Sequence, residues 1–271
     1  MSDTQVLLTG LAIGESPRWH DGRLWLANWC TQQVLTVDAD GASEVALLVP
    51  TSFPLSIDWL PDGGPLLVVS GREARLLRRE PDGSLALHAD LSGIADTFNE
   101  IVVDRRGNAY VNSANVIALV PASGAPRQVA DGISFGNGIV VTPDGSTLIV
   151  AESHGNRLTA FDITDDGDLA NRRAWAELEG CYPDGICLDA EGAVWYADVP
   201  NKCCERVAEG GRVLQTIALD RGGFACMLGG ADGRTLFIAA AEWHGMDKID
   251  ADARTGQVLT ARVDVPRAGR P

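Results

Sequence analysis

The chain has 271 residues, enough for a sizeable core, and a formal net charge of −15. This charge argues against nucleic acid and anionic membrane surfaces as partners, because both attract basic proteins. Apolar residues make up 45% of the sequence, and 30 glycines and 13 prolines favour many turns over long helices.

The N-terminal stretch shows no targeting signal. Residues 1–17 lack a basic segment, and Gly10 and Gly14 interrupt their short apolar run. We also find no run of 18 apolar residues that would form a membrane helix. The six cysteines lack the spacing of a zinc site. We therefore expect reduced thiols, most of them in the core, in a cytoplasmic protein.

One short pattern recurs along the whole chain. A polar turn with a glycine precedes an apolar strand, and the turn glycines are Gly22, Gly63, Gly107, Gly145, Gly192 and Gly233. The intervals between them are 41, 44, 38, 47 and 41 residues. Because the six copies fill the chain, we predict a single domain over residues 1–271 with no linker.

Each copy is predicted to hold four short strands. In the first copy an apolar run leads to the turn, and Leu24–Ala27, Val34–Asp38 and Val45–Val49 follow it. The corresponding segments of later copies include Leu148–Ala151, Leu158–Asp162, Ala174–Leu178 and Val213–Leu219. Four strands in about 40 residues are typical of a propeller blade. The sequence therefore predicts an all-β, six-bladed β-propeller with four antiparallel strands per blade around a central channel.

Two features of the ring concern its closure and its packing. Val6–Leu8 and Val258–Val265 both have the character of a fourth strand, so either could complete the last blade. Trp19, Trp25 and Trp195 are expected to pack between blades.

Counting back seven or eight residues from each turn glycine reaches the start of an innermost strand. In a propeller these positions face one end of the channel, and here they carry Glu15, Ser56, Asn99, Asn137, Asp184 and Ala225. Asn and Asp also cap strand ends without any further role. However, two carboxylates and two carboxamides at equivalent positions favour a site for a hard cation. Glu15 and Asp184 would repel each other unless a cation or a proton lay between them.

Three segments carry a family resemblance: Gly14–Trp19, Asn137–Ile139 and Pro183–Asp189. They resemble the signatures of the SMP-30/gluconolactonase/LRE-like family, and the likeness spans essentially the whole chain. That family consists of six-bladed propellers that act as metal-dependent lactonases and esterases.

The resemblance implies roles for the residues at the channel mouth. Glu15, Asn137 and Asp184 would bind a divalent cation, with Asp184 also acting as the general acid and base. Asn99 would lie beside the metal, as a substrate contact or as a fourth ligand. Ca²⁺ is the first choice of ion, with Mg²⁺, Mn²⁺, Zn²⁺ or Fe²⁺ as alternatives.

The third copy departs from the family pattern. Sugar lactonases of the family typically show Arg-x-Asn-Asp-Gly, whereas this chain has Thr97-Phe98-Asn99-Glu100-Ile101. The arginine that would bond sugar hydroxyls is Thr97 here, so a less polar lactone or ester becomes more plausible. Besides Asn99 and Thr97, the residues expected to contact the substrate are Trp29, Asn112 and His154. The last three could instead be exposed loop residues.

The main hypothesis is a divalent-metal-dependent lactonase that acts on a small-molecule lactone or ester, as a monomer or weak oligomer. The metal would polarise the carbonyl, and Asp184 would take a proton from water and return it to the leaving alkoxide. A serine triad is not expected, since no Gly-x-Ser-x-Gly elbow is present. A phosphotriesterase of the same architecture fits the polar residues equally well. A non-catalytic binding propeller with a structural metal is the third hypothesis, although the Trp-Asp and Gly-His signatures of interaction propellers are missing.

Overall fold

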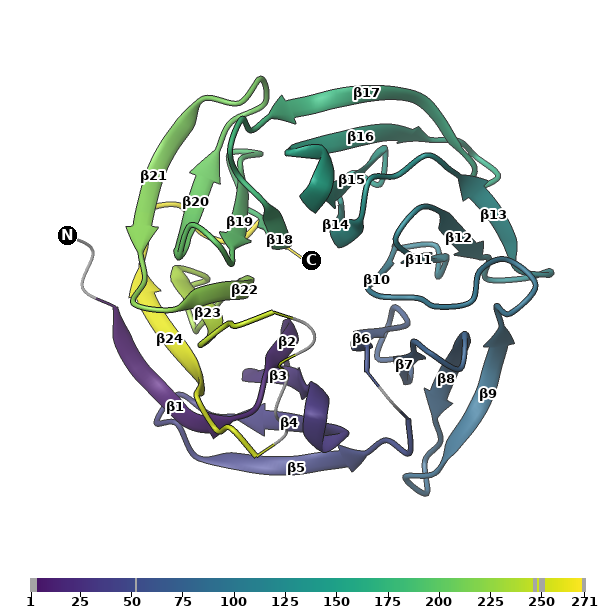
Figure 1. Ribbon diagram of the computed structural model, residues 1–271. Coiled ribbons are helices and arrows are strands. Elements are labelled where there is room, and N and C mark those ends of the chain that lie inside the picture. The colour runs from purple at the N-terminus through teal and green to yellow at the C-terminus, as the bar shows by residue number, and fades with distance from the viewer. Residues whose placement is uncertain (1–3, 52, 246–247, 249–251, 270–271) are drawn as a thin grey trace.

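The computed structural model describes residues 4–51, 53–245, 248 and 252–269. Within these ranges the chain forms six antiparallel sheets of four strands, arranged in a ring around a central axis (Figure 1). The prediction of an all-β, six-bladed propeller is confirmed.

The blades are numbered along the chain, and their strands are given from the innermost outward. Blade 1 contains β2 (Gly14–His20), β3 (Arg23–Asn28), β4 (Gln33–Val37) and β5 (Ser43–Leu48). Blade 2 contains β6 (Leu55–Trp59), β7 (Leu66–Ser70), β8 (Arg75–Arg79) and β9 (Leu85–Asp90). Blade 3 contains β10 (Ile101–Val103), β11 (Ala109–Asn112), β12 (Ile117–Val120) and β13 (Arg127–Ala130). Blade 4 contains β14 (Gly136–Val141), β15 (Thr147–Glu152), β16 (Arg157–Ile163) and β17 (Leu169–Glu177). Blade 5 contains β18 (Pro183–Leu188), β19 (Val194–Asp198), β20 (Cys203–Val207) and β21 (Val213–Ala218). Blade 6 contains β22 (Gly222–Gly229), β23 (Thr235–Ala241), β24 (Gly256–Arg262) and β1 (Gln5–Leu11).

The N-terminal strand closes the ring. β1 pairs antiparallel with β24, with Val6 opposite Leu259, and forms the outermost strand of blade 6. Of the two segments considered for this place, Val6–Leu8 therefore holds it, and Val258–Val265 belongs mostly to the third strand. The first and last parts of the chain thus share one sheet, which satisfies backbone groups that an open ring would leave unpaired.

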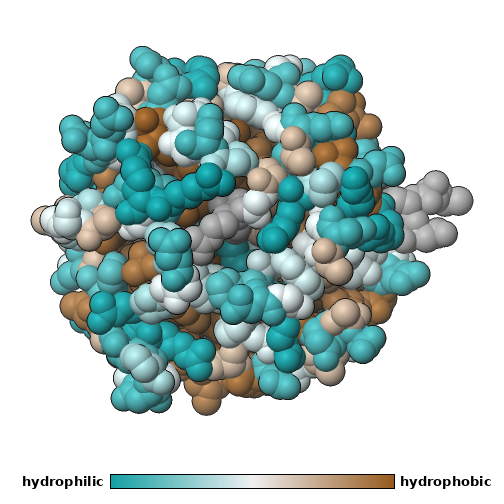
Figure 2. All heavy atoms as spheres, turned by 180° about the vertical axis from the view of Figure 1, so that it is seen from behind, coloured by the Kyte–Doolittle hydropathy of each residue, from teal (hydrophilic) through white to brown (hydrophobic). Residues whose placement is uncertain are grey.

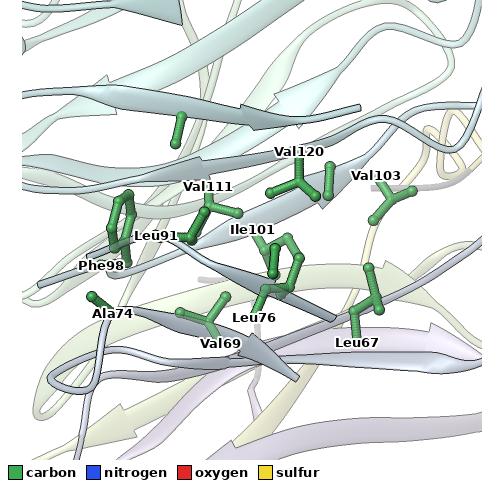
Figure 3. Close-up of a cluster of buried hydrophobic side chains, with 13 residues drawn as sticks. Leu67, Val69, Ala74, Leu76, Leu91, Phe98, Ile101, Val103, Val111 and Val120 are labelled. Carbon is green, nitrogen blue, oxygen red and sulfur yellow. The ribbon is translucent and has the colours of Figure 1, made fainter. Parts of the chain in front are cut away.

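The hydrophobic core lies between neighbouring blades. Between blades 2 and 3, for example, Leu67 and Val69 of β7 face Ile101 and Val111 of blade 3 (Figure 3). Comparable clusters fill the other interfaces around the ring. Since a fully buried aliphatic side chain contributes roughly 1.5–3 kcal/mol, these clusters hold the blades together and leave the channel mouth available for polar groups.

The three tryptophans lie where they were predicted. Trp195 is fully buried in the cluster between blades 5 and 6. Trp19 stacks on Phe237 of blade 6 with ring centroids 5.3 Å apart, and Trp25 meets Trp59 of blade 2 edge-on at 5.2 Å. All six cysteines are free, as expected, and four of them are buried.

The C-terminal segment covers the turns at one end of the inner strands. Pro266 accepts a hydrogen bond from the amide of Ala190 at 2.8 Å, and the Arg267 amide donates to Gly233 at 2.9 Å. The face turned away from the viewer in Figure 1 is covered mostly by hydrophilic residues, with hydrophobic ones scattered among them (Figure 2). None of the helices in the described ranges is long and apolar enough to span a membrane.

Candidate metal centre and substrate cavity

The starts of the innermost strands converge on a cavity of about 660 Å³. Glu15 lies in β2, Asn137 in β14 and Asp184 in β18, while Asn99 lies two residues before β10. All of these side chains line the cavity, and they are called the floor residues below: Glu15, Asn99, Asn137 and Asp184. The structure therefore brings together the polar residues that the repeat pattern placed at the channel mouth.

The remaining two equivalent positions do not line the cavity. Ser56 is buried, and its hydroxyl donates a hydrogen bond of 2.7 Å to the backbone carbonyl of Asn99. Ala225 is buried against the inner strand of blade 5. Ser56 thus supports a floor residue from behind, whereas Ala225 provides only packing.

Two glycines allow the inner strands to approach closely enough to form the floor. A Cβ atom on Gly138 would lie 2.5 Å from both the Asp184 carbonyl oxygen and the Ile186 amide. A Cβ atom on Gly185 would lie 2.5 Å from the Cβ of Ala225. The glycine that follows Asn137 and the one that follows Asp184 are therefore needed for space, since any side chain there would push blades 4, 5 and 6 apart.

The two carboxylates of the floor are held under electrostatic strain. Glu15 and Asp184 are only 5% and 9% exposed. Burial, followed by the charges of Asp184 and Glu100, raises the pKa of Glu15 well above its ordinary value. Burial, followed by Glu100 and Asp198, raises the pKa of Asp184 in the same direction. Two buried carboxylates in one place are costly unless a cation or a proton compensates them.

A buried oxygen on the floor also lacks a donor. Asp184 Oδ1 has no hydrogen-bond partner among the described residues. Such an orphaned acceptor costs free energy in an ordinary interior, whereas a carboxylate oxygen that binds a cation needs no hydrogen-bond donor. In the part of the chain that the structure describes, no three or more His, Cys, Asp or Glu side chains form a metal cluster by themselves. A cation at the floor would therefore need the carboxamide oxygens as well.

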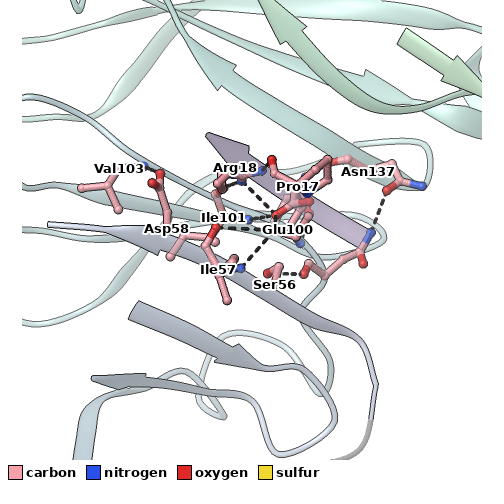
Figure 4. Close-up of polar contacts among 12 residues, drawn as sticks. Pro17, Arg18, Ser56, Ile57, Asp58, Glu100, Ile101, Val103 and Asn137 are labelled. Carbon is pink, nitrogen blue, oxygen red and sulfur yellow. Dashed lines mark hydrogen bonds and ion pairs between the residues drawn. The ribbon is translucent and has the colours of Figure 1, made fainter. Parts of the chain in front are cut away.

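Hydrogen bonds fix the orientation of the two carboxamides. Asn99 Nδ2 donates to Asn137 Oδ1 at 3.1 Å and to the Gly136 carbonyl at 3.3 Å (Figure 4). Asn137 Nδ2 donates to Ser153 Oγ at 3.4 Å, and Ser153 Oγ in turn donates to the Pro183 carbonyl at 2.7 Å. Because both amide nitrogens donate to groups of the protein, the oxygen is the end of each carboxamide that could bind a cation, although Asn137 Oδ1 already accepts one bond from Asn99.

A buried polar network supports Glu15 from below. Glu100 Oε1 accepts hydrogen bonds from Ser16 Oγ at 2.9 Å, from Arg18 Nη2 at 3.2 Å and from the Ile101 amide at 3.0 Å (Figure 4). Burial raises the pKa of Glu100, and Arg18 opposes that rise. Ser16 is fully buried with φ of +48°, a left-handed conformation that a non-glycine residue adopts only where its surroundings impose it. This network fixes the backbone that carries Glu15.

The supporting network was not predicted from the sequence. Glu100 was noted only as a departure from the family pattern, and Ser16 and Arg18 only as members of a motif. Their position in the sequence could have indicated this role, because Glu100 directly follows Asn99 and Ser16 directly follows Glu15. Their side chains do not line the cavity.

The residues expected to contact the substrate divide into two groups. Trp29, Thr97 and His154 line the cavity. Asn112 does not, since it is fully buried, donates to the Asn137 carbonyl and accepts a bond of 3.0 Å from the Glu100 amide. Asn112 therefore lies behind the floor and holds two neighbouring segments together.

A second layer of the cavity lies two residues before five of the six equivalent positions. These residues come just before the innermost strands, and all five line the cavity. We call this layer the upper ring, and it consists of Ile13, Pro54, Thr97, Phe135 and Tyr182. Only Thr97 was predicted from the sequence, although counting back two residues from Glu15, Ser56, Asn137 and Asp184 reaches the other four.

The fold agrees with comparisons to known proteins. A sequence model of the SMP-30/gluconolactonase/LRE-like region matches residues 13–242. The protein belongs to this family.

The similar proteins include named lactonases and calcium-binding proteins. The chain is 28% identical to 6-deoxy-6-sulfogluconolactonase of Pseudomonas putida, over 96% of this chain and 94% of that protein. It is 26% identical to regucalcin of Gallus gallus, over 87% of this chain and 85% of that protein. The crystal structure of the calcium-binding protein regucalcin from Agrobacterium tumefaciens superimposes with a TM-score of 0.81 at 21% identity, covering 100% of this chain and 97% of that one. At 21% identity, this structural similarity shows that the two proteins share a fold.

Proposed function

We propose that the protein is a divalent-metal-dependent lactonase that hydrolyses a small-molecule lactone. The observation that carries the proposal is the orphaned Asp184 Oδ1, which is buried near Glu15 and two half-buried carboxamides at the floor of the cavity. The relative from Pseudomonas putida is named a lactonase, and the Agrobacterium tumefaciens protein is described as calcium-binding, which supports both parts of the proposal.

The floor residues suit a hard cation. Glu15, Asn137 and Asp184 would hold it, and Asn99 offers its Oδ1 as a fourth ligand or as an acceptor for the substrate. Ca²⁺ is the preferred ion for an all-oxygen set. When bound, the cation would polarise the substrate carbonyl and stabilise the negative charge that develops on its oxygen.

Asp184 is the group proposed to move the proton. A water molecule attacks the carbonyl carbon, and its proton passes to the Asp184 carboxylate. The ring C–O bond then breaks, and Asp184 returns the proton to the leaving alkoxide, so that one water is added and a hydroxy acid results. Asp184 lines the cavity at its floor, where a carboxylate can take a proton from the attacking water and return it to the leaving group.

The other residues of the wall would position the substrate. Asn99 is held by its bonds to Asn137 and Gly136, so its side chain keeps one direction while the substrate enters. Phe135 and His154 line the same cavity, and their rings stack with centroids 4.3 Å apart. The stacked pair would exclude water from one side of the ester.

The test is hydrolysis of a panel of lactones by protein treated with a chelator and then supplied with Ca²⁺. We expect hydrolysis that disappears with the chelator, returns with the ion, and falls by orders of magnitude in Asp184→Ala. Activity that survives both treatments would contradict the proposal. An organophosphate triester in the same panel tests the alternative enzyme, and a cation-loaded protein inert on every ester would indicate a binding propeller instead.

A further inference from the structure

The upper ring of the cavity differs in chemistry from the floor. The floor carries carboxylates and carboxamides, whereas the upper ring has no charged or amide side chain. Its polar atoms are the hydroxyls of Thr97 and Tyr182. A substrate whose ester lies at the floor must extend its remaining part through this layer.

Several aromatic side chains line the wall around the upper ring. Phe135 stacks on His154, with centroids 4.3 Å apart, and Trp29 stacks on Phe53 at 5.8 Å. On the blade 6 side, Phe224 meets Trp243 edge-on at 5.5 Å. All six of these residues line the cavity.

Much of the polar chemistry of the wall is already used within the protein. Trp29 Nε1 donates to the Leu55 carbonyl at 2.7 Å, and Ser153 Oγ donates to the Pro183 carbonyl. Ser113 Oγ donates to Asn115 Oδ1 at 3.3 Å. The guanidinium carbon of Arg72 lies 4.8 Å from the centroid of the Phe53 ring, in a cation–π contact. Phe53 thus contacts both Trp29 and Arg72. The donors of Trp29, Ser113 and Ser153 are therefore poorly placed to replace the hydration of several sugar hydroxyls.

Exposed aromatic side chains gather at this cavity. Phe135 and Tyr182 are 43% and 42% exposed although they belong to the cavity wall. The other large hydrophobic residues that are exposed in the described ranges lie on outermost strands: Val6, Val45, Leu48, Leu87 and Val213. Leaving two aromatic rings in water at the mouth of a cavity suits a ligand that covers them.

We propose that the substrate is a lactone bearing an aromatic ring, which lies against Phe135 and Tyr182 while its ester group lies at the floor. This inference rests on the lactonase function proposed above and narrows its substrate class. We therefore expect polyhydroxylated lactones to be poorer substrates, because the upper ring has only two hydroxyl groups that could form hydrogen bonds with them.

The experiment compares lactones that share one reacting group. δ-Valerolactone with a phenyl or a methyl substituent on the carbon that bears the ring oxygen provides this pair, and δ-gluconolactone represents the sugar class. The Ca²⁺-loaded protein is assayed as wild type and as Phe135→Ala, Tyr182→Ala and Tyr182→Phe. Tyr182→Phe is the matched control, because it keeps the ring and removes only the hydroxyl.

We expect kcat/KM for the phenyl lactone to exceed that for the methyl and sugar lactones by about tenfold or more, the size of effect that aromatic packing can give. Phe135→Ala and Tyr182→Ala should lower the phenyl value about tenfold and change the methyl value less than about twofold. Tyr182→Phe should behave as the wild type. Binding of the phenyl lactone to Asp184→Asn, measured by calorimetry, gives a readout that does not depend on turnover.

The contrary results separate the two proposals. If δ-gluconolactone is the best substrate, or if the alanine variants slow all lactones equally, the aromatic assignment is wrong and the lactonase function stands. If no lactone is hydrolysed and the phenyl lactone does not bind to Asp184→Asn, both proposals are wrong.

Discussion

Asn99 Nδ2 donates a hydrogen bond of 3.1 Å to Asn137 Oδ1, and this bond joins blades 3 and 4 at the floor of the cavity. It uses one lone pair of the Asn137 oxygen and leaves the other for a cation. It also ties the two carboxamides together, so that moving one of them displaces the other. Asn99 can therefore influence cation binding even if it is not itself a ligand.

Replacing Asn99 should weaken cation binding. Asn99→Leu keeps the branched shape of the side chain, although it is larger, and removes the donor that orients Asn137 Oδ1. Loss of such an orienting bond typically costs about 10–100-fold in metal affinity. Calorimetric titration of the chelator-treated protein with Ca²⁺ measures the effect. Ser92→Ala, at an exposed position that does not line the cavity, is the control and should retain nearly the wild-type affinity.

Removing a floor carboxylate should stabilise the metal-free protein. Asp184→Asn keeps the shape of the side chain and removes a charge that burial and neighbouring carboxylates disfavour. Substitutions of this kind commonly raise the free energy of unfolding by roughly 0.5–2 kcal/mol. Thermal unfolding in chelator should show a higher Tm for the variant, and the order should reverse in excess Ca²⁺. A variant less stable than wild type in both conditions would show that Asp184 has a structural role instead.

A methyl group on Gly138 should disturb the floor without touching its ligands. The added Cβ would collide with the Asp184 carbonyl and the Ile186 amide, so Gly138→Ala must shift the strand that carries Asp184. We expect a loss of hydrolysis of at least about tenfold, since small misplacements of reacting groups are costly. Gly93→Ala is the matched control, because nothing lies within 4 Å of a Cβ at that position. Equal activity of the two variants would rule out the proposed packing constraint.

The repeat pattern predicts the fold and the floor well for a physical reason. The period of the turn glycines reflects the size of one blade, so counting from Gly22 or Gly192 reaches Glu15 or Asp184 without any knowledge of the structure. Ring closure could not be predicted, because β1 and β24 both carry alternating apolar residues and only their pairing distinguishes them. Sequence order alone does not say which strand is outermost.

The same limit explains the residues that were misplaced or missed. Asn112 follows the pattern of a loop residue at the end of a strand, yet its side chain is directed between segments by its bonds to Asn137 and Glu100. The aromatic wall depends on contacts between distant positions, such as Phe224 with Trp243. Such contacts arise from the way in which blades pack and not from local periodicity.

Glu152 makes the stability of blade 4 depend on pH. Burial acts to raise its pKa, but hydrogen bonds from Arg157, Thr159 and the Ser134 amide outweigh burial and lower it. A carboxyl group with a lowered pKa stabilises the folded state above its unfolded pKa of about 4.3, and this stabilisation is lost as the pH falls through the folded value. Glu152→Gln should therefore be less stable than wild type at pH 7, and the difference should shrink on acidification. Unfolding by denaturant at several pH values measures it, and a difference independent of pH would contradict this account.

The most direct test of the central claim is reactivation by a cation. The protein is stripped with a chelator, supplied with Ca²⁺ in steps, and assayed on a lactone alongside Asp184→Asn. We predict that wild-type hydrolysis rises from the background rate to a plateau as the ion is added, while the variant stays near background throughout. Full hydrolysis by the stripped protein, or equal rates for the variant and the wild type, would contradict a metal-dependent lactonase that uses Asp184.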